Sequence, residues 1–72
     1  MKTEIIHIAN NIKKLRKKMN LSQKDLAFLL KLESNSTVSG YESGKWYPPL
    51  DHVIILSKLF NVGIEDLILK KL

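Results

Sequence analysis

The sequence predicts an all-α fold of five short helices. Apolar residues recur every three or four positions in several segments, as they do on the buried side of an amphipathic helix. No segment alternates apolar and polar residues as a half-buried strand does, and Asn, Gly and Pro residues separate the segments. At 72 residues, 44% hydrophobic and 26% charged, the chain has the size and composition of one globular domain over residues 1–72.

The first helix is predicted from an apolar stripe that faces the core and a lysine-rich opposite side. Asn20 ends this helix, because asparagine favours turns. The stripe contains Ile5, Ile8, Ile12, Leu15 and Met19, and the opposite side carries Lys13, Lys14, Lys17 and Lys18.

The second and third helices are predicted from capping residues as well as from periodicity. Ser22 with Asp25 three residues later forms a capping-box pattern, which begins the second helix. Lys31 to Ser34 then form a turn, and Ser34 or Asn35 caps the third helix, at about residues 35–43. The inward residues are Leu26, Ala27 and Leu30 in the second helix and Val38 and Tyr41 in the third.

The last two helices follow a proline-containing break. Gly44 suits a helix C-terminus, and Pro49 suits the first turn of the fourth helix. Asn61 to Gly63 interrupt the chain before a fifth helix over residues 64–69. The predicted inward residues are Leu50, Val53, Ile54, Leu56 and Phe60, with Leu59 beside them, and then Leu67 and Ile68.

The segment from Asn35 to Gly44 is unusual because its outward positions carry small polar side chains in place of charges. Such groups can approach a nucleic-acid groove closely and hydrogen-bond base edges. The charge distribution points the same way: residues 1–45 hold nine Lys and Arg against four Asp and Glu, whereas residues 46–72 hold three of each. The excess positive charge therefore lies with the segment predicted to meet DNA.

The order and spacing of these residues resemble the Cro/C1-repressor (XRE-type) helix-turn-helix family over roughly residues 8–69. The helix-turn-helix unit would span about residues 22–44. The matching residues are Ile12, Leu15-Arg16, Leu21-Ser22-Gln23, Leu26-Ala27, Thr37-Val38-Ser39, Tyr41-Glu42, Gly44-Lys45, Pro48, Leu50 and the segment from Asn61-Val62 to Leu67. The resemblance implies a compact lambda-repressor-like domain whose third helix enters the major groove of double-stranded DNA.

The resemblance also implies roles for individual residues. Arg16, the only arginine, would form a partly buried ion pair with Glu42 and so be structural. Gln23 would contact a phosphate and brace the start of the third helix. Base contacts would come from Asn35, Ser36, Thr37 and Gly40, and phosphate contacts from Ser43 and Lys45.

The sequence departs from the family pattern at two places, and both affect how the family's residue roles apply here. Seven residues separate Leu30 from Val38 where the family has six, and Lys31 replaces the usual turn glycine, so the register at Asn35 and Ser36 is open by one position. The longer turn is expected to relieve the need for a positive φ at Lys31. Gly40 costs about 1 kcal/mol relative to Ala in a helix, which indicates either a close approach at that position or fewer base contacts.

Two alternatives concern surface residues. Trp46 and Tyr47 are expected in the core, with contact to the DNA backbone as the alternative. Exposed Phe28 and Leu29 are either ordinary surface residues or a protein-binding surface, and residues 69–72 with Ile55 are a candidate dimer contact.

The function predicted is therefore sequence-specific transcriptional regulation, most simply repression by a homodimer on a two-fold operator. The alternative is an antitoxin-like or bridging module that uses the same fold to hold a protein partner. His7 and His52 have no spaced partner for a metal or acid–base site, so no enzyme activity, metal or cofactor is expected. With no cysteine and no apolar run longer than Leu26–Leu30, the prediction is a cytoplasmic protein without membrane contact.

Overall fold

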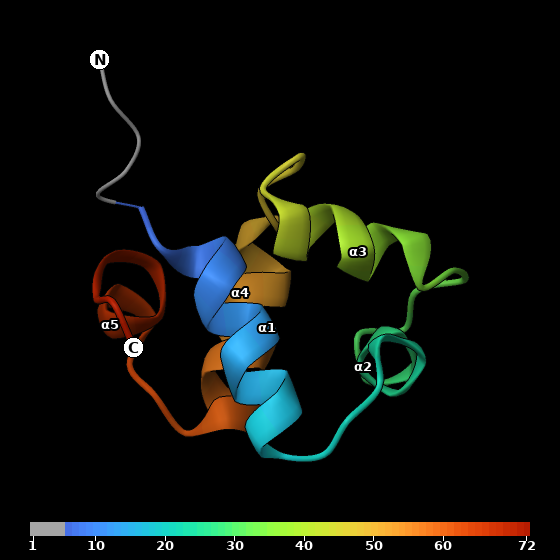
Figure 1. Ribbon diagram of the computed structural model, residues 1–72, viewed down its shortest axis with the longest axis horizontal. Coiled ribbons are helices and arrows are strands. Elements are labelled where there is room, and N and C mark those ends of the chain that lie inside the picture. Colours follow the sequence, from blue (N-terminus) through green and yellow to red (C-terminus); the bar gives the residue numbers. More distant parts are fainter. Residues whose placement is uncertain (1–5) are drawn as a thin grey trace.

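α1 (Ile8–Lys18) lies in the middle of the fold and contacts α3, α4 and α5 (Figure 1). The computed structural model describes residues 6–72, and Ile5 of the predicted stripe lies outside them. α2 (Gln23–Leu29) packs against α3 (Ser36–Ser43), and α4 (Leu50–Phe60) packs against α5 (Ile64–Leu69). In Figure 1, α2 and α3 lie on one side of α1 and α5 on the other. This architecture confirms the predicted all-α, five-helix fold.

The core is formed by side chains from all five helices. The buried apolar residues are Ile8, Ile12, Leu26, Ala27, Leu30, Val38, Tyr41, Val53, Leu56, Phe60 and Leu67. Leu15, Leu59 and Ile68 are partly buried against them, as predicted. No helix within residues 6–72 has the length and apolar content needed to cross a membrane.

Three predicted inward residues are exposed, and each prediction was wrong for a geometric reason. Leu50 is 69% exposed and Ile54 is also exposed, because the buried stripe of α4 is narrower than predicted and follows Val53, Leu56 and Phe60. Met19 is exposed because it follows the last helical residue of α1, where the chain turns away from the stripe.

The turn between α2 and α3 retains a left-handed residue. The capping box of α2 is present: Ser22 Oγ accepts from Asp25 N–H at 2.9 Å, and Asp25 Oδ2 accepts from Ser22 N–H at 2.9 Å. After α2, Lys31 adopts φ +59°, so the longer turn does not remove the positive φ, contrary to expectation. Ser34, one of the two predicted caps, accepts from Ser36 N–H at the start of α3.

Asn11 connects α1 to the end of α5 through three hydrogen bonds of its side-chain amide. The residue is buried, and its Nδ2 donates to the carbonyl oxygens of Leu67 at 2.8 Å and Lys70 at 2.7 Å. Its Oδ1 accepts from Leu72 N–H at 3.1 Å. Since a helix leaves its last carbonyl groups without intrahelical donors, Asn11 supplies partners for the C-terminus of this six-residue helix.

Candidate nucleic-acid interface

The inner side of α3 is held by apolar packing. Val38 and Tyr41 are buried in the core, as predicted. The Tyr41 hydroxyl lies 2.9 Å from His52 Nδ1, and the two rings meet edge to face. Burial, with a smaller contribution from nearby Asp51, raises the pKa of Tyr41. Because these contacts fix α3 from beneath, its outer side is presented in one orientation.

The predicted pair between Arg16 and Glu42 is present and joins α1 to α3. Arg16 Nε donates to Glu42 Oε2 at 2.6 Å and its Nη2 donates to Oε1 at 3.0 Å, a two-pronged arrangement that fits a guanidinium to a carboxylate. The side chains are 9% and 3% exposed. The hydrogen bond to Glu42 raises the pKa of Arg16, while burial opposes that rise.

Two further contacts complete the surroundings of this pair. Arg16 Nη1 donates to the carbonyl oxygen of Leu21, at the start of the segment that leads into α2. Gln23 Nε2 donates to Glu42 Oε1 at 3.1 Å. Gln23 therefore braces the far end of α3, and the expectation that it braces the first residues of that helix was wrong. Together these bonds fix α1, α2 and α3 relative to one another.

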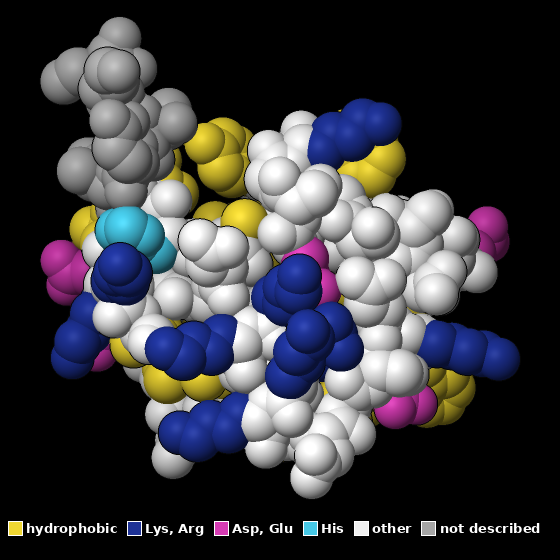
Figure 2. Space-filling view, viewed as in Figure 1, with side chains coloured by type: hydrophobic (Ala, Val, Ile, Leu, Met, Phe, Trp, Pro, Cys, Tyr) yellow, Lys and Arg dark blue, Asp and Glu magenta, His cyan; other side chains and the backbone are white. Residues whose placement is uncertain are grey.

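The outer side of α3 carries exposed, small and uncharged side chains. Ser36, Ser39 and Ser43 are exposed along the helix, and Asn35 is exposed at its N-cap. Thr37 is half-buried. Figure 2 shows Lys and Arg side chains gathered over α1, beside a largely uncharged surface over α3. This face therefore combines positive charge with short hydrogen-bonding groups.

Gly40 is buried, unlike the other predicted base-contacting positions, because Trp46 lies over it. A Cβ atom at residue 40 would lie 2.1 Å from Trp46 Cε3, so no larger residue fits without displacing the indole. Trp46 itself is 47% exposed and Tyr47 is exposed, so the expectation that these two aromatic residues pack into the core was wrong. Of the two explanations left open for Gly40, a close approach is present, and it is a contact with Trp46.

The end of α3 and the loop after it carry the remaining residues predicted to contact phosphate, Ser43 and Lys45. Gly44 ends the helix in the left-handed conformation at φ +80°, which favours glycine. Ser43 Oγ donates to the carbonyl oxygen of Gly40 at 3.2 Å, and Lys45 Nζ lies 5.1 Å from the centre of the Trp46 ring. Ser43 and Lys45 are both exposed at the end of α3.

The sequence-based expectations assigned no role to Ser39 or Asn11 and did not include the placement of Trp46 over Gly40. Ser39 is exposed on the outer side of α3, and its position one turn from Ser36 and Ser43 is visible in the sequence as a helical spacing. The contacts of Asn11 and the placement of Trp46 over Gly40 have no such local signal, since each depends on tertiary packing.

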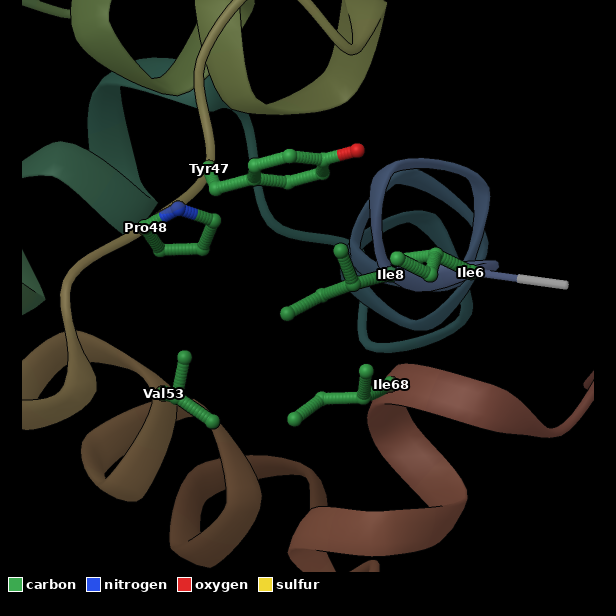
Figure 3. A pocket seen from close by; sticks show the side chains of 6 residues that line it. All are labelled: Ile6, Ile8, Tyr47, Pro48, Val53 and Ile68. Carbon is green, nitrogen blue, oxygen red and sulfur yellow. The ribbon is translucent and has the colours of Figure 1, made fainter. Parts of the chain in front are cut away.

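Two apolar features lie apart from the outer side of α3. Phe28 is 80% exposed and, with Leu21 and Leu29, lines a shallow groove on α2 that Lys24 and Asp25 border. A second hollow of about 190 Å³ lies between α1, α4, α5 and the loop after α3, where apolar side chains converge (Figure 3). It is lined by Ile6, Ile8, Tyr47, Pro48, Val53 and Ile68.

Comparisons with known proteins identify this arrangement. The HTH-type transcriptional activator BcrR of Enterococcus faecalis is 39% identical over 57 residues, which cover 79% of this chain but 28% of BcrR. A transcriptional regulator from Listeria innocua superposes with a TM-score of 0.82 at 30% identity, over 88% of this chain and 58% of that one. This chain thus spans only part of both relatives.

Two smaller proteins share the fold over nearly their whole length. The P22 c2 repressor, solved with a synthetic operator, gives a TM-score of 0.80 at 23% identity over 89% of this chain and 96% of that one. The restriction-modification controller protein C.AhdI of Aeromonas hydrophila gives 0.74 at 27% identity over 92% and 98%. A model of the family described as helix-turn-helix matches residues 12–67. The chain belongs to the helix-turn-helix family of the Cro/C1 (XRE) type.

Proposed function

We propose that α3 is the recognition helix of a sequence-specific transcriptional regulator and enters the major groove of double-stranded DNA. The observation that carries this proposal is the contrast between the two sides of α3. Its inner side is fixed by Val38, Tyr41 and the Glu42–Arg16 pair, whereas its outer side is exposed, small and uncharged. A helix held in this way can enter a DNA groove without changing its position in the fold. Binding of this kind requires no catalytic residue.

Base contacts are assigned to the start and outer side of α3. An asparagine amide can bond adenine in two places, and a threonine methyl can contact the thymine methyl. Asn35, Ser36 and Thr37 are the proposed base-contacting residues, to which the exposed Ser39 is added. Gly40 is proposed to serve this surface through Trp46 and not by direct contact.

Phosphate contacts are assigned to polar and positive groups around α3. Lys45 and Ser43 lie at its C-terminal end, and Gln23 is partly exposed at the first position of α2. The exposed lysines of α1 lie on the same face of the molecule (Figure 2). Such contacts fix the register of a protein on the duplex but carry no sequence information.

The proposed regulatory outcome is repression in the cytoplasm, by a bound protein that blocks polymerase. We propose a homodimer on a two-fold operator, with the recognition helices about 34 Å apart so that each meets one half-site. Ile55 and Leu69 are exposed apolar candidates for the contact between copies. Leu72 is a weaker candidate, because it hydrogen-bonds α1 through Asn11 and Lys14.

Site selection from random duplexes, followed by titration at several salt concentrations, tests the DNA proposal. For about six phosphate contacts, affinity should fall on the order of a thousandfold between about 50 and about 200 mM salt. Asn35→Ala or Thr37→Ala should weaken the preferred site by roughly 1–3 kcal/mol and leave unrelated duplexes unaffected. Lys58→Ala, an exposed change on α4, is the matched control. Equal losses on all duplexes would contradict a base-contacting role.

A second candidate function, the protein-binding module, is favoured by the groove around Phe28. A phenylalanine that is 80% exposed beside two other apolar residues is typical of an interaction surface. If the selection yields no preferred sequence at any salt concentration, this candidate replaces the first. Phe28→Ser should then abolish partner binding while leaving the fold intact, since the ring lies outside the core.

A further inference from the structure

Trp46 covers α3 at the one helical position that lacks a side chain. The indole carbons Cε3 and Cζ3 would lie 2.1 Å and 2.5 Å from a Cβ atom at Gly40. The backbone N–H groups of Lys45 and Trp46 both donate to the carbonyl oxygen of Gly40, at 3.0 Å and 3.2 Å. The six-membered ring of the indole therefore lies against the helix at residue 40, and its position depends on that residue being glycine.

The covered position belongs to the side of α3 that the proposed interface uses. Residues three and four apart lie on the same side of a helix, so Gly40 lies between Ser36 and Ser43. Both serines are exposed. Along this row the indole of Trp46 forms the surface at position 40, and the residue as a whole is 47% exposed.

The charge beside the indole indicates which part of DNA this surface suits. Lys45 Nζ lies 5.1 Å from the centre of the Trp46 ring, so a cation and an aromatic face are held together at the end of α3. A lysine ammonium pairs with a phosphate as a compact charge, and an indole offers an apolar face together with an N–H donor. A deoxyribose followed by its phosphate presents the matching sequence of apolar and anionic groups.

We propose that Trp46 is a DNA-contacting residue that packs on a deoxyribose of the backbone flanking α3, with Lys45 on the adjoining phosphate. Gly40 is the positioning residue for Trp46. This inference rests on the proposed function. It adds a DNA contact made by Trp46, a loop residue, at the position where α3 has no side chain of its own. Because every nucleotide has the same sugar, this contact strengthens binding without selecting a sequence.

The first test uses Trp46→Ala, with the neighbouring exposed Tyr47→Ala as the control. Trp46→Ala should weaken binding to the preferred and to an unrelated duplex by the same factor, on the order of tenfold, as truncation of an aromatic contact residue does. Tyr47→Ala should bind both duplexes as the wild type does. In the wild type, emission from Trp46, the only tryptophan in the chain, should change on saturation with DNA.

The second test separates a contact from a general loss of structure. Gly40→Ala favours the helix but displaces the indole, so affinity should fall and Trp46 emission should change in the free protein while the melting temperature does not drop. In a Trp46→Ala background the same Gly40→Ala change should cost no further affinity, because the residue it displaces is gone. An additional loss in that background would overturn the role of Gly40.

The remaining outcomes decide between this inference and the proposed function. If the wild type binds its preferred duplex and Trp46→Ala binds equally well, Trp46 is not a contact and the inference alone is overturned. A loss confined to the preferred duplex would overturn contact with the sugar, because it would indicate base contact. A wild type that binds no duplex would overturn the proposed function and this inference together.

Discussion

The two ends of α1 each join the helix to another part of the fold through a buried polar side chain, but by different means. Toward its C-terminal end, Arg16 holds α3 through a charged pair with Glu42. Toward its N-terminal end, Asn11 holds the end of α5 through neutral hydrogen bonds to backbone groups. Arg16 therefore links side chains of α1 and α3, whereas Asn11 supplies hydrogen-bond donors to backbone carbonyl groups at the end of the short helix α5.

The difference reflects what each partner helix lacks. The inner side of α3 is already held in the core by apolar packing. What the ion pair adds is a fixed orientation of the helix, because its two hydrogen bonds hold the guanidinium and the carboxylate in one geometry. α5 has only six residues, so a large share of its carbonyl groups lie in the last turn without helical donors. We therefore expect changes at Arg16 to alter both stability and the proposed DNA binding, and changes at Asn11 to alter stability alone.

The largest expected effect comes from removing one member of the charged pair. Arg16→Met leaves Glu42 buried without its cation and should lower the free energy of unfolding by about 3–5 kcal/mol. Lys17→Met, an exposed change one residue away, is the control. Urea titration measures both, and the double variant with Glu42→Leu should recover much of the loss. A loss below about 1 kcal/mol would show that the pair is worth no more than an exposed one.

The next effect tests the other end of α1. Asn11→Ala leaves the carbonyl groups of Leu67 and Lys70 without their donor and should cost about 1–3 kcal/mol. Asn10→Ala, its exposed neighbour, should cost little. Hydrogen exchange should rise first in α5, while DNA affinity of the folded protein stays unchanged. A fall in affinity equal to that of an Arg16 variant would break the distinction between the two ends.

A smaller effect is expected at the exposed capping box of α2, where Arg16 bonds only the residue before it, Leu21. Ser22→Ala removes the side-chain acceptor for Asp25 N–H and should lower the free energy of unfolding by about 1 kcal/mol. Thermal melting at neutral pH measures this loss. Ser34→Ala at the start of α3 is a useful companion, because Ser34 accepts from Ser36 N–H in a similar way.

The same capping box gives a pH signature with a definite sign. The hydrogen bond from Ser22 N–H lowers the pKa of Asp25 below its ordinary value of 3.8. Because the pKa of the folded state is the lower one, this stabilisation is present above pH 3.8 and is lost as the pH falls through the folded value. Asp25→Asn should therefore melt below the wild type at neutral pH, and the gap should close on acidification. A constant gap would contradict this account.

Local features of the fold were predictable because their causes are local. Apolar spacing predicted the five helices, and the Ser22 and Asp25 pattern predicted the start of α2. The pair of Arg16 with Glu42 followed from the family resemblance, since nothing in the spacing of two residues 26 apart requires contact. Leu50 and Ile54 were misplaced because a helix with many apolar residues does not reveal how wide its buried stripe is.

The candidate site was less predictable than the fold because several of its features depend on tertiary contacts. Trp46 is an ordinary loop residue until α3 is folded beneath it, and its indole then covers Gly40, one of the residues expected to contact DNA. Gln23 was expected to contact the start of α3, but its side chain donates to Glu42 near the end of that helix. This contact could not be predicted locally, because the ion pair with Arg16 sets the position of the Glu42 carboxylate. Asn11 is separated by 56 residues from its partner Leu67.

The smallest expected effect concerns Lys31, in the turn between α2 and α3. Lys31 has φ +59°, a conformation that costs an L-residue of this kind roughly 1 kcal/mol and costs glycine almost nothing. Lys31→Gly removes that cost but adds freedom to the unfolded chain, so the net gain in unfolding free energy should be below about 1 kcal/mol. Lys24→Gly, within α2, should instead destabilise by about 1 kcal/mol. Denaturant titration of both variants checks the opposite signs, and a loss at Lys31 as large as the loss at Lys24 would show that the turn gains nothing from glycine.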